Sequence, residues 1–374
     1  MAERAPRVGF LIDRWQPERG GAERALAQLA RHLESESWDV LAFGLEGPTK
    51  GTTAPGAFHA VSATGLSRSA RERSLSRNMI RTATREQCDV TVGVRHVTDV
   101  DVLWSHGGSH LATLDASGRK PTGRHKTFID LERAALEGGA STVVCPSQLV
   151  RDEFAHFYPD STPRLEVIPN GVDLDEFHPR EREARGAALR AELQLDARVP
   201  LFVFAARHPE RKGLEELFSA LAELQVPWHL LVAGPRDADE WQGRARGAGL
   251  GGERVSTRAH VDPITLAAGA DVCVLPTWRD TSGLVLLEAL AAGTPVVTTS
   301  LAGAADVVTS PAAGEVVASP EDAAALRAAL ERACARVLAK NVDRAVVRAH
   351  VEKRGHGPWL AALTAVLQRH ARKA

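Results

Sequence analysis

The chain has 374 residues, enough for two domains that each bury a hydrophobic core. Its 46 basic and 47 acidic side chains nearly cancel, so the net charge gives no reason to expect nucleic acid or another polyanion as a partner. The 4 cysteines lie far apart, which argues against a disulfide framework or a Cys-x-x-Cys metal site and suits a reducing cytoplasm.

The N-terminal half begins with a predicted strand, a polar loop and a helix. The strand covers residues 8–12, the loop ends at Gly20-Gly21, and the helix runs over residues 22–33. A strand, glycine loop and helix in this order can bind an anion at the helix N-terminus. A Gly-Gly pair by itself is more often a plain turn, and that alternative stays open.

Further strand-like runs alternate with helical or polar segments, a pattern that predicts a parallel α/β sheet. These runs lie at residues 40–43, 58–61, 90–94, 102–104, 142–145 and 165–168. The fifth strand leads into Trp104-Ser-His-Gly-Gly-Ser-His110, which offers His106 and His110 as candidate site residues. Gly107-Gly108 argue against a helical HxxxH zinc site, and each histidine could instead be structural.

An arginine-rich stretch separates the third and fourth of these strands. It carries Arg68, Arg71, Arg73, Arg77, Arg81 and Arg85 among few bulky apolar residues. A solvated helix face is the first interpretation, and an electrostatic dock on anionic lipid is the alternative. No apolar run reaches spanning length and the N-terminus is too short for a signal sequence, so we expect a soluble or peripheral protein.

The turn at residues 169–173 is interpreted as an interdomain linker, because Asn170 and Gly171 tolerate the left-handed backbone of a sharp turn. A charged helix is expected over residues 180–193. A second alternating series follows at residues 201–205, 229–233, 255–258, 272–275, 296–299 and 314–317. Ser319 is the expected N-cap of a helix that reaches residue 338, and residues 359–371 have the apolar spacing of a terminal helix.

Two basic residues follow the first strand of this second series. Arg207 and Lys212 stand in Ala-Arg-His-Pro-Glu-Arg-Lys-Gly, between the strand and the next helix. This places them at the carboxyl edge of the sheet, where α/β proteins bind ligands.

The stretch from residue 271 to residue 299 reads as a strand, a loop, a helix and a strand. Amides near Gly283, Leu284 and Val285 are expected at the helix N-terminus, where they could bind a phosphate. Asp280 in the loop and Glu288 in the second helical turn bracket this position. Each carboxylate can accept two hydrogen bonds from sugar hydroxyls, so the arrangement suits a nucleotide sugar.

An acidic residue followed after seven residues by Glu, in a Gly-Leu-Val-Leu-Leu-Glu-Ala setting, resembles the signature of the retaining glycosyltransferases of family 4. Within that family, the chain looks closest to the lipopolysaccharide core glucosyltransferase branch. The resemblance implies the GT-B fold: two doubly wound Rossmann-like domains whose parallel sheets face a central cleft, with a C-terminal helix crossing back to the first domain. The implied domains are an acceptor-side domain at residues 1–172, a nucleotide-sugar-binding domain at residues 173–355, and the returning helix at residues 356–374.

The resemblance also implies roles for the residues that match the family pattern. Asp280 would contact the donor sugar, although the family residue is usually Glu, and Glu288 would contact the ribose. Arg207 and Lys212 would bind the diphosphate without a metal ion or other cofactor. Gly20 and Gly21 would close on the donor phosphates, and His106 or His110 would lie near the donor sugar.

The predicted function is hexose transfer from a nucleoside diphosphate sugar, with UDP favoured, to a glycan or lipid-linked acceptor with retention of configuration. A noncatalytic nucleotide-sugar-binding subunit and a GT-B sugar-nucleotide epimerase remain alternatives. A cytoplasmic protein is expected, with peripheral contact to anionic membrane through the arginine-rich stretch.

Overall fold

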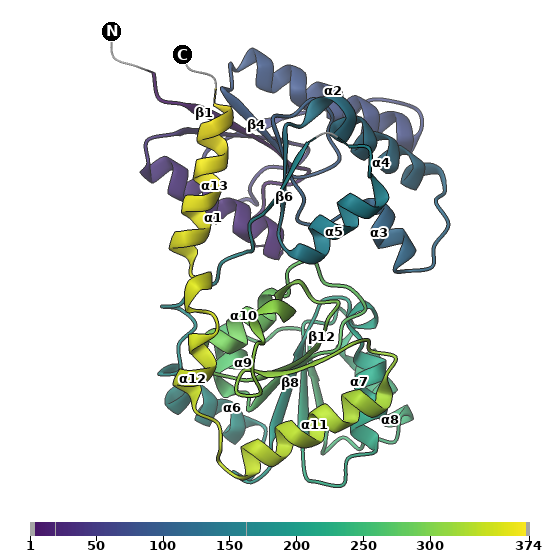
Figure 1. Ribbon diagram of the computed structural model, residues 1–374, viewed down its shortest axis with the longest axis vertical. Coiled ribbons are helices and arrows are strands. Elements are labelled where there is room, and N and C mark those ends of the chain that lie inside the picture. Colours follow the sequence, from purple (N-terminus) through teal and green to yellow (C-terminus); the bar gives the residue numbers. More distant parts are fainter. Residues whose placement is uncertain (1–3, 19, 162, 372–374) are drawn as a thin grey trace. The chain divides into compact units, whose positions relative to one another are not determined.

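The computed structural model describes residues 4–18, 20–161 and 163–371, and Figure 1 follows the chain through them. The chain divides into two compact units. The N-terminal unit comprises Met1–Asn170 together with Gly357–Ala374, and the C-terminal unit comprises Gly171–His356. The chain therefore passes between the units twice, once in the turn after Pro169 and once after His356.

The described part of the N-terminal unit forms a seven-stranded parallel sheet in the order β3-β2-β1-β4-β5-β6-β7. The strands are β1 (Arg7–Leu11), β2 (Asp39–Gly44), β3 (Ala57–Ala60), β4 (Val90–Gly93), β5 (Val102–Trp104), β6 (Thr142–Cys145) and β7 (Arg164–Val167). The central strands are buried and apolar, as parallel strands covered by helices on both faces require. The strand order reverses between β1 and β4, which marks the switch point of this sheet.

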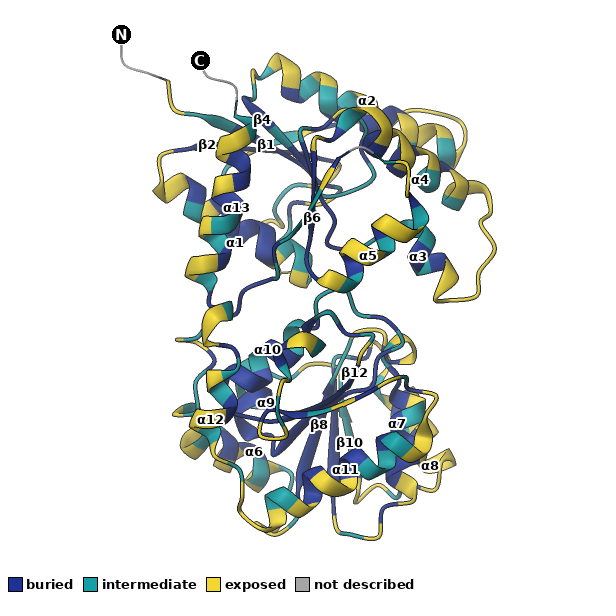
Figure 2. Cartoon of the chain, in the orientation of Figure 1, coloured by how far each residue is buried: buried dark blue, intermediate teal, exposed yellow. Residues whose placement is uncertain are grey.

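Helices cover this sheet with their apolar sides. They are α1 (Gly21–Ser35), α2 (Arg68–Arg85), α3 (His110–Asp115), α4 (Gly123–Ala134) with the π-turn η1 (Ala135–Gly139), α5 (Gln148–Phe157) and α13 (His356–His370). In α1, for example, Leu26, Leu29 and Leu33 are buried at helical spacing. Figure 2 shows the strands as a dark-blue centre, with yellow on the outer sides of the helices.

The C-terminal helix α13 completes the core of the N-terminal unit, as predicted. It buries Trp359, Leu363, Val366 and Leu367 in the same cluster as residues of β1 and α1. Near its end, His370 Nε2 lies 2.9 Å from Thr142 Oγ1 at the start of β6.

We expect Leu363→Ala to destabilise the N-terminal unit by about 2–5 kcal/mol, because it leaves a cavity in a closed core. Leu363 is only 3% exposed. Urea denaturation measures the change. Gln368→Ala is the matched control: Gln368 is exposed on the same helix, so its loss should cost less than about 0.5 kcal/mol. Equal effects of the two substitutions would contradict the packing of α13 described above.

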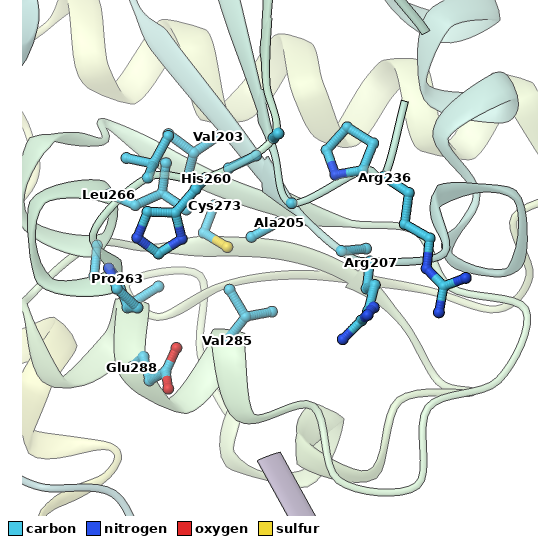
Figure 3. A pocket seen from close by; sticks show the side chains of 18 residues that line it. Val203, Ala205, Arg207, Arg236, His260, Pro263, Leu266, Cys273, Val285 and Glu288 are labelled. Atoms are coloured by element: carbon cyan, nitrogen blue, oxygen red, sulfur yellow. The ribbon is translucent and has the colours of Figure 1, made fainter. Parts of the chain in front are cut away.

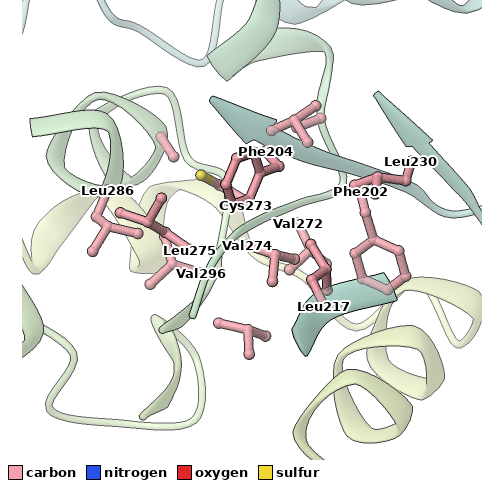
Figure 4. Packing of buried hydrophobic residues seen from close by; sticks show 14 of the residues in the cluster. Phe202, Phe204, Leu217, Leu230, Val272, Cys273, Val274, Leu275, Leu286 and Val296 are labelled. Atoms are coloured by element: carbon pink, nitrogen blue, oxygen red, sulfur yellow. The ribbon is translucent and has the colours of Figure 1, made fainter. Parts of the chain in front are cut away.

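The described part of the C-terminal unit forms a six-stranded parallel sheet in the order β10-β9-β8-β11-β12-β13. The strands are β8 (Leu201–Ala205), β9 (His229–Ala233), β10 (Val255–Arg258), β11 (Val272–Leu275), β12 (Val296–Thr299) and β13 (Gly314–Val317). The strand order reverses between β8 and β11. Figure 4 shows Phe202 and Phe204 of β8 packed with apolar residues of β11 and with Leu217.

The helical elements of this unit surround the sheet. They are η2 (Arg182–Gly186), α6 (Ala187–Glu192), η3 (Pro209–Lys212), α7 (Leu214–Ala222), α8 (Ala238–Gly247), α9 (Pro263–Gly269), α10 (Leu284–Ala291), η4 (Gly303–Val307), α11 (Ala323–Leu338), α12 (Arg344–Ala349) and η5 (Glu352–Arg354).

The predicted fold class is confirmed, since both units are doubly wound parallel α/β structures. The helix expected over residues 180–193 is confirmed over residues 182–192, where the π-helix η2 runs into α6. The N-cap expected at Ser319 is wrong. Asp322, not Ser319, caps α11 by accepting a hydrogen bond from the Ala325 amide at 2.9 Å, because residues 319–322 form a turn instead of a first helical turn.

Candidate functional site

A cavity of about 430 Å³ lies at the carboxyl ends of β8, β9 and β10 in the C-terminal unit. Helix α10 forms one of its walls, next to the switch point where the strand order reverses between β8 and β11. Such a switch point leaves a crevice because the helices that follow the two strands cover opposite faces of the sheet. The base of the cavity is apolar, with Val203, Ala205, Cys273 and Leu266 among its lining residues.

The predicted residues Arg207 and Glu288 both line this cavity (Figure 3). Arg207 follows the end of β8 by two residues, and Glu288 lies in α10. In Figure 3, the Arg207 side chain lies toward one end of the cavity and Glu288 toward the other, with Val285 between them. The cavity therefore presents a cation and a carboxylate to one ligand.

Cys273 lies in the cavity wall beside Glu288 and stays a thiol. Burial raises its pKa to about 12, and the charge of Glu288 contributes to the rise. A neutral, buried thiol behaves as a small apolar side chain, so Cys273 shapes the cavity and is not a nucleophile at neutral pH.

Lys212 and Asp280 form an ion pair beside the start of α10. Lys212 Nζ lies 2.7 Å from Asp280 Oδ2 and also donates to the Arg279 carbonyl at 3.2 Å. Glycine at position 213 allows the backbone next to Lys212 to lie close to the segment that leads to Asp280. Gly213 has φ of 77°, and a Cβ there would lie 1.9 Å from the Pro276 carbonyl oxygen. Neither Lys212 nor Asp280 is among the residues that line the 430 Å³ cavity.

The Asp280 carboxylate also binds the backbone at the start of α10. Its Oδ1 accepts hydrogen bonds from the amides of Ser282 at 3.1 Å and Gly283 at 2.9 Å. Burial acts to raise the pKa of Asp280, but the Lys212 ammonium and these hydrogen bonds outweigh it, and the pKa lies below its ordinary value. The carboxylate is therefore ionised and serves as an internal anion at the helix N-terminus.

The expectation that the Gly283 amide is open to a phosphate is therefore wrong, because that amide already donates to Asp280. The amides of Leu286 and Leu287 donate to the Gly283 carbonyl inside the helix. The amides of Leu284 and Val285 precede them, in the part of the first turn that has no intrahelical acceptor. These two amides, beside Val285 in the cavity wall, remain the candidates for the anion site, which stays a prediction.

The glycine loop of the N-terminal unit leads into α1, with Gly20 as its N-cap and Gly21 as its first residue. Gly20 has φ of −170°, an extended conformation open to any residue, so the backbone does not require glycine there. A Cβ on Gly20 would lie 2.8 Å from Glu23 Oε2, at the end of a flexible side chain. Arg19, the first residue of the predicted motif, lies outside the described residues.

The two candidate histidines differ in their surroundings. His106 follows β5, is 9% exposed and packs on Trp104, with ring centroids 4.2 Å apart. His110 begins α3, and its Nε2 lies 3.0 Å from Nδ1 of His125. Burial lowers the pKa of both imidazoles, for His106 to about 4, and the neighbouring His125 adds to the effect at His110. Both imidazoles are therefore neutral at neutral pH.

We expect His106→Gln to flatten the acid dependence of stability. The folded pKa of about 4 lies below the ordinary 6.5, so between these values the unfolded chain binds more protons and the free energy of unfolding falls as the pH falls. The contribution is fully present above about pH 6.5, and roughly 2 to 3 kcal/mol is lost by pH 4.5. Urea titrations of both proteins at pH 7 and pH 4.5 measure it. An identical pH dependence in wild type and variant would contradict the burial of His106 as the cause.

Sequence reasoning missed a group of residues beside these histidines. A cavity of about 100 Å³ is lined by His106, Arg95, His96 and Glu132, among others. Glu132 is 4% exposed and accepts hydrogen bonds from the Tyr158 hydroxyl at 2.6 Å and from the His110 amide at 3.1 Å, so it holds the start of α3.

Part of the site around these histidines could have been predicted from the sequence. Asp13 follows β1 and Arg95 follows β4, the two strands at the switch point of the N-terminal sheet, and Arg95 Nε lies 2.6 Å from Asp13 Oδ1. The rule that located Arg207 would have selected them. Glu132 and Tyr158 come from distant helical segments and had no such signal.

The arginine-rich stretch forms α2, and its arginines are exposed, as a solvated helix face predicts. Arg73 pairs with Asp130 of α4 at 2.8 Å. Leu66, just before the helix, is fully exposed. Among the described residues, no helix is both long and apolar enough to cross a membrane. Residues 4–18, 20–161 and 163–371 also contain no cluster of three or more His, Cys, Asp or Glu that could hold a metal ion.

Models of known protein families match both halves of the chain. Residues 19–176 match the family described as Glycosyltransferase Family 4, and residues 199–336 match Glycosyl transferases group 1. A probable transglycosylase of Burkholderia thailandensis is 33% identical over 67% of this chain and 65% of its own length. Matches to other curated relatives span about half of those proteins.

Two named neighbours have solved structures. WaaG of Escherichia coli, a lipopolysaccharide glucosyltransferase, is 26% identical over 57% of this chain and 58% of its own. A crystal structure of WaaG has a TM-score of 0.76 at 21% identity and covers 97% of this chain and 98% of that one. HepE of Anabaena, solved with UDP and glucose, has a TM-score of 0.68 at 17% identity over 97% of this chain and 100% of that one.

At these identities the likeness shows the fold alone, which is the two-domain Rossmann-like fold of GT-B glycosyltransferases. The two family matches together account for most of both sheets. The N-terminal half of the chain is therefore similar to the glycosyltransferase family 4 model, and the C-terminal half is similar to the glycosyl transferases group 1 model.

Proposed function

We propose that the protein transfers a hexose from a nucleoside diphosphate sugar to a glycan or lipid-linked acceptor, with retention of configuration and without a catalytic metal ion. The observation that carries the proposal is the cavity at the switch point of the C-terminal sheet. Arg207 and Glu288 line it, and the open end of α10 adjoins it. UDP is the favoured nucleotide, and the UDP and glucose bound to HepE, a protein of the same fold, support that choice.

In this proposal, the two ends of the cavity bind different parts of the donor. Glu288 accepts hydrogen bonds from the ribose hydroxyls, because an ionised carboxylate is a strong acceptor for paired hydroxyls. Arg207 and the amides of Leu284 and Val285 bind the diphosphate. These groups also stabilise the negative charge that grows on the diphosphate as the glycosidic bond breaks.

Lys212 and Asp280 act in the proposal as a pair. The ion pair keeps Lys212 beside the anion site with little net charge, and Asp280 holds the loop before α10 through its amide hydrogen bonds. When a donor diphosphate occupies the site, Lys212 can exchange its carboxylate partner for a phosphate oxygen, which frees Asp280 to accept a hydrogen bond from the donor sugar.

The N-terminal unit contributes the acceptor side in the proposal. His106 and His110 are neutral imidazoles, so each can donate one hydrogen bond and accept another. Gly20 and Gly21 leave the start of α1 free of side chains, which permits close approach of a ligand to the backbone. The exposed arginines of α2, with Leu66, would place the protein on the cytoplasmic face of an anionic membrane. Cosedimentation with phosphatidylglycerol vesicles but not with phosphatidylcholine vesicles tests that placement.

Incubation with UDP-, GDP- and ADP-sugars, with free monosaccharides and octyl glycosides as acceptors, tests the function. Release of nucleoside diphosphate together with a new glycoside supports the proposal, and NMR of the anomeric proton tests retention. Bound donor with no turnover would instead identify a noncatalytic nucleotide-sugar-binding subunit. An epimerised donor without transfer would identify a sugar-nucleotide epimerase.

A further inference from the structure

We propose that Arg236 is a second guanidinium for the donor diphosphate, a role that the family resemblance does not assign to it. The inference rests on the proposed function and names a further residue of the same site. Arg236 lines the 430 Å³ cavity together with Arg207. Figure 3 shows both arginine side chains toward the same end of the cavity, away from Glu288 and His260.

The backbone brings Arg236 beside Arg207. Strands β8 and β9 are neighbours in register, with Ala205 opposite Ala233, and the Ala206 amide donates to the Ala233 carbonyl at 2.9 Å. The chain leaves β9 through Gly234, which has φ of 95° and lies so close to Ala206 that an added Cβ would be 3.1 Å from the Ala206 carbonyl oxygen. Pro235 then restricts the backbone before Arg236. Two adjacent strand ends therefore deliver one arginine each to the same edge.

The charges in the site explain why a second guanidinium is needed. Lys212 is already paired with Asp280 at 2.7 Å, so this pair adds little net charge. Among the described residues that line the cavity, the arginine, lysine, aspartate and glutamate side chains are Arg207, Arg236 and Glu288. Arg207 and Glu288 cancel, and Arg236 makes the cavity positive. A nucleoside diphosphate carries at least two negative charges, so it requires that excess.

The side chain of Arg236 is available for this role. It is exposed, and no hydrogen bond or ion pair with another described residue engages its guanidinium. A guanidinium binds phosphate oxygens through two parallel hydrogen bonds, which a lysine ammonium does not reproduce. Arg236 should therefore act on the diphosphate and not on the base or the ribose.

Calorimetric titration of Arg236→Ala, Arg236→Lys and Arg246→Ala with uridine, UMP and UDP tests the assignment. If wild type prefers another base, the matching series replaces this one. We expect Arg236→Ala to weaken UDP binding by about tenfold to a hundredfold while uridine binding changes little. Arg236→Lys should recover part of the loss because it keeps the charge. Arg246 is an exposed arginine of α8 away from the cavity, and its replacement should leave the UDP-to-uridine affinity ratio unchanged.

An affinity ratio in Arg236→Ala equal to that in Arg246→Ala would overturn the assignment. So would an equal loss for uridine and UDP, since that result would place Arg236 at the base or ribose. These outcomes leave the proposed function standing, because wild type would still bind UDP. If wild type binds none of UDP, GDP and ADP, the proposed function itself fails, and the role of Arg236 fails with it.

Discussion

Replacing Arg207 with alanine is expected to lower kcat by about a hundredfold to a thousandfold while raising KM much less. The diphosphate gains its full negative charge only as the glycosidic bond breaks. Removing the guanidinium therefore destabilises the transition state more than the bound substrate. Initial-rate kinetics with the donor identified in the nucleotide-sugar panel separate the two constants. A rise in KM with unchanged kcat would show instead that Arg207 stabilises the bound substrate and the transition state equally.

The companion variant at Lys212 needs a charge-balanced design. Lys212→Ala alone leaves the partly buried Asp280 carboxylate without its cation, so a loss of activity could reflect a disturbed loop. Lys212→Met combined with Asp280→Asn removes both charges and keeps the side-chain volumes.

The same assay also tests the proposal that catalysis requires no metal ion. If excess EDTA abolishes wild-type activity and Mg²⁺ restores it, that proposal is wrong.

Glu288→Gln should weaken nucleotide-sugar binding by about tenfold to a hundredfold, with the fold intact. Glutamine has the shape of glutamate but loses the charge that strengthens hydrogen bonds from the ribose hydroxyls, a difference of about 1.5 to 3 kcal/mol. Isothermal titration with UDP measures the change, and thermal unfolding checks the fold.

A deoxyribose ligand makes the Glu288 test specific. In wild type, 2′-deoxy-UDP should bind more weakly than UDP, and in Glu288→Gln the difference should shrink, because the partner of the missing hydroxyl has been weakened. Glu331→Gln is the matched control, since Glu331 lies on the surface of α11 with its side chain 54% exposed. An unchanged preference for the ribose form in Glu288→Gln would place the ribose elsewhere.

Strand positions and fold class were predictable because buried parallel strands are short apolar runs that end in polar residues. The strands expected at residues 201–205 and 272–275 coincide with β8 and β11. The loop after β8 and the helix after β11 then indicated Arg207 and Glu288 as candidates, and the structure places both on one cavity. Their roles toward a ligand stay predictions.

Capping details were less predictable because competing local conformations differ by small free energies. Ser319-Pro-Glu-Asp322 has an acceptable N-cap at either end, and the structure uses Asp322. The same limit applies at α10, where the sequence shows an open helix N-terminus and the structure shows Asp280 bound to the Gly283 amide.

The return of α13 to the first unit was implied by the family resemblance. The sequence by itself determined the two parallel α/β sheets and the strands and loops that carry candidate residues. These follow from periodicity and local chemistry, which act over a few neighbouring residues. Only the tertiary structure decided which side chains from separate loops meet: Lys212 with Asp280, Arg236 beside Arg207, and Glu132 with Tyr158. The physical reason is that these contacts depend on strand order and register. The sequence of one loop does not determine which other loop lies next to it at the edge of the sheet.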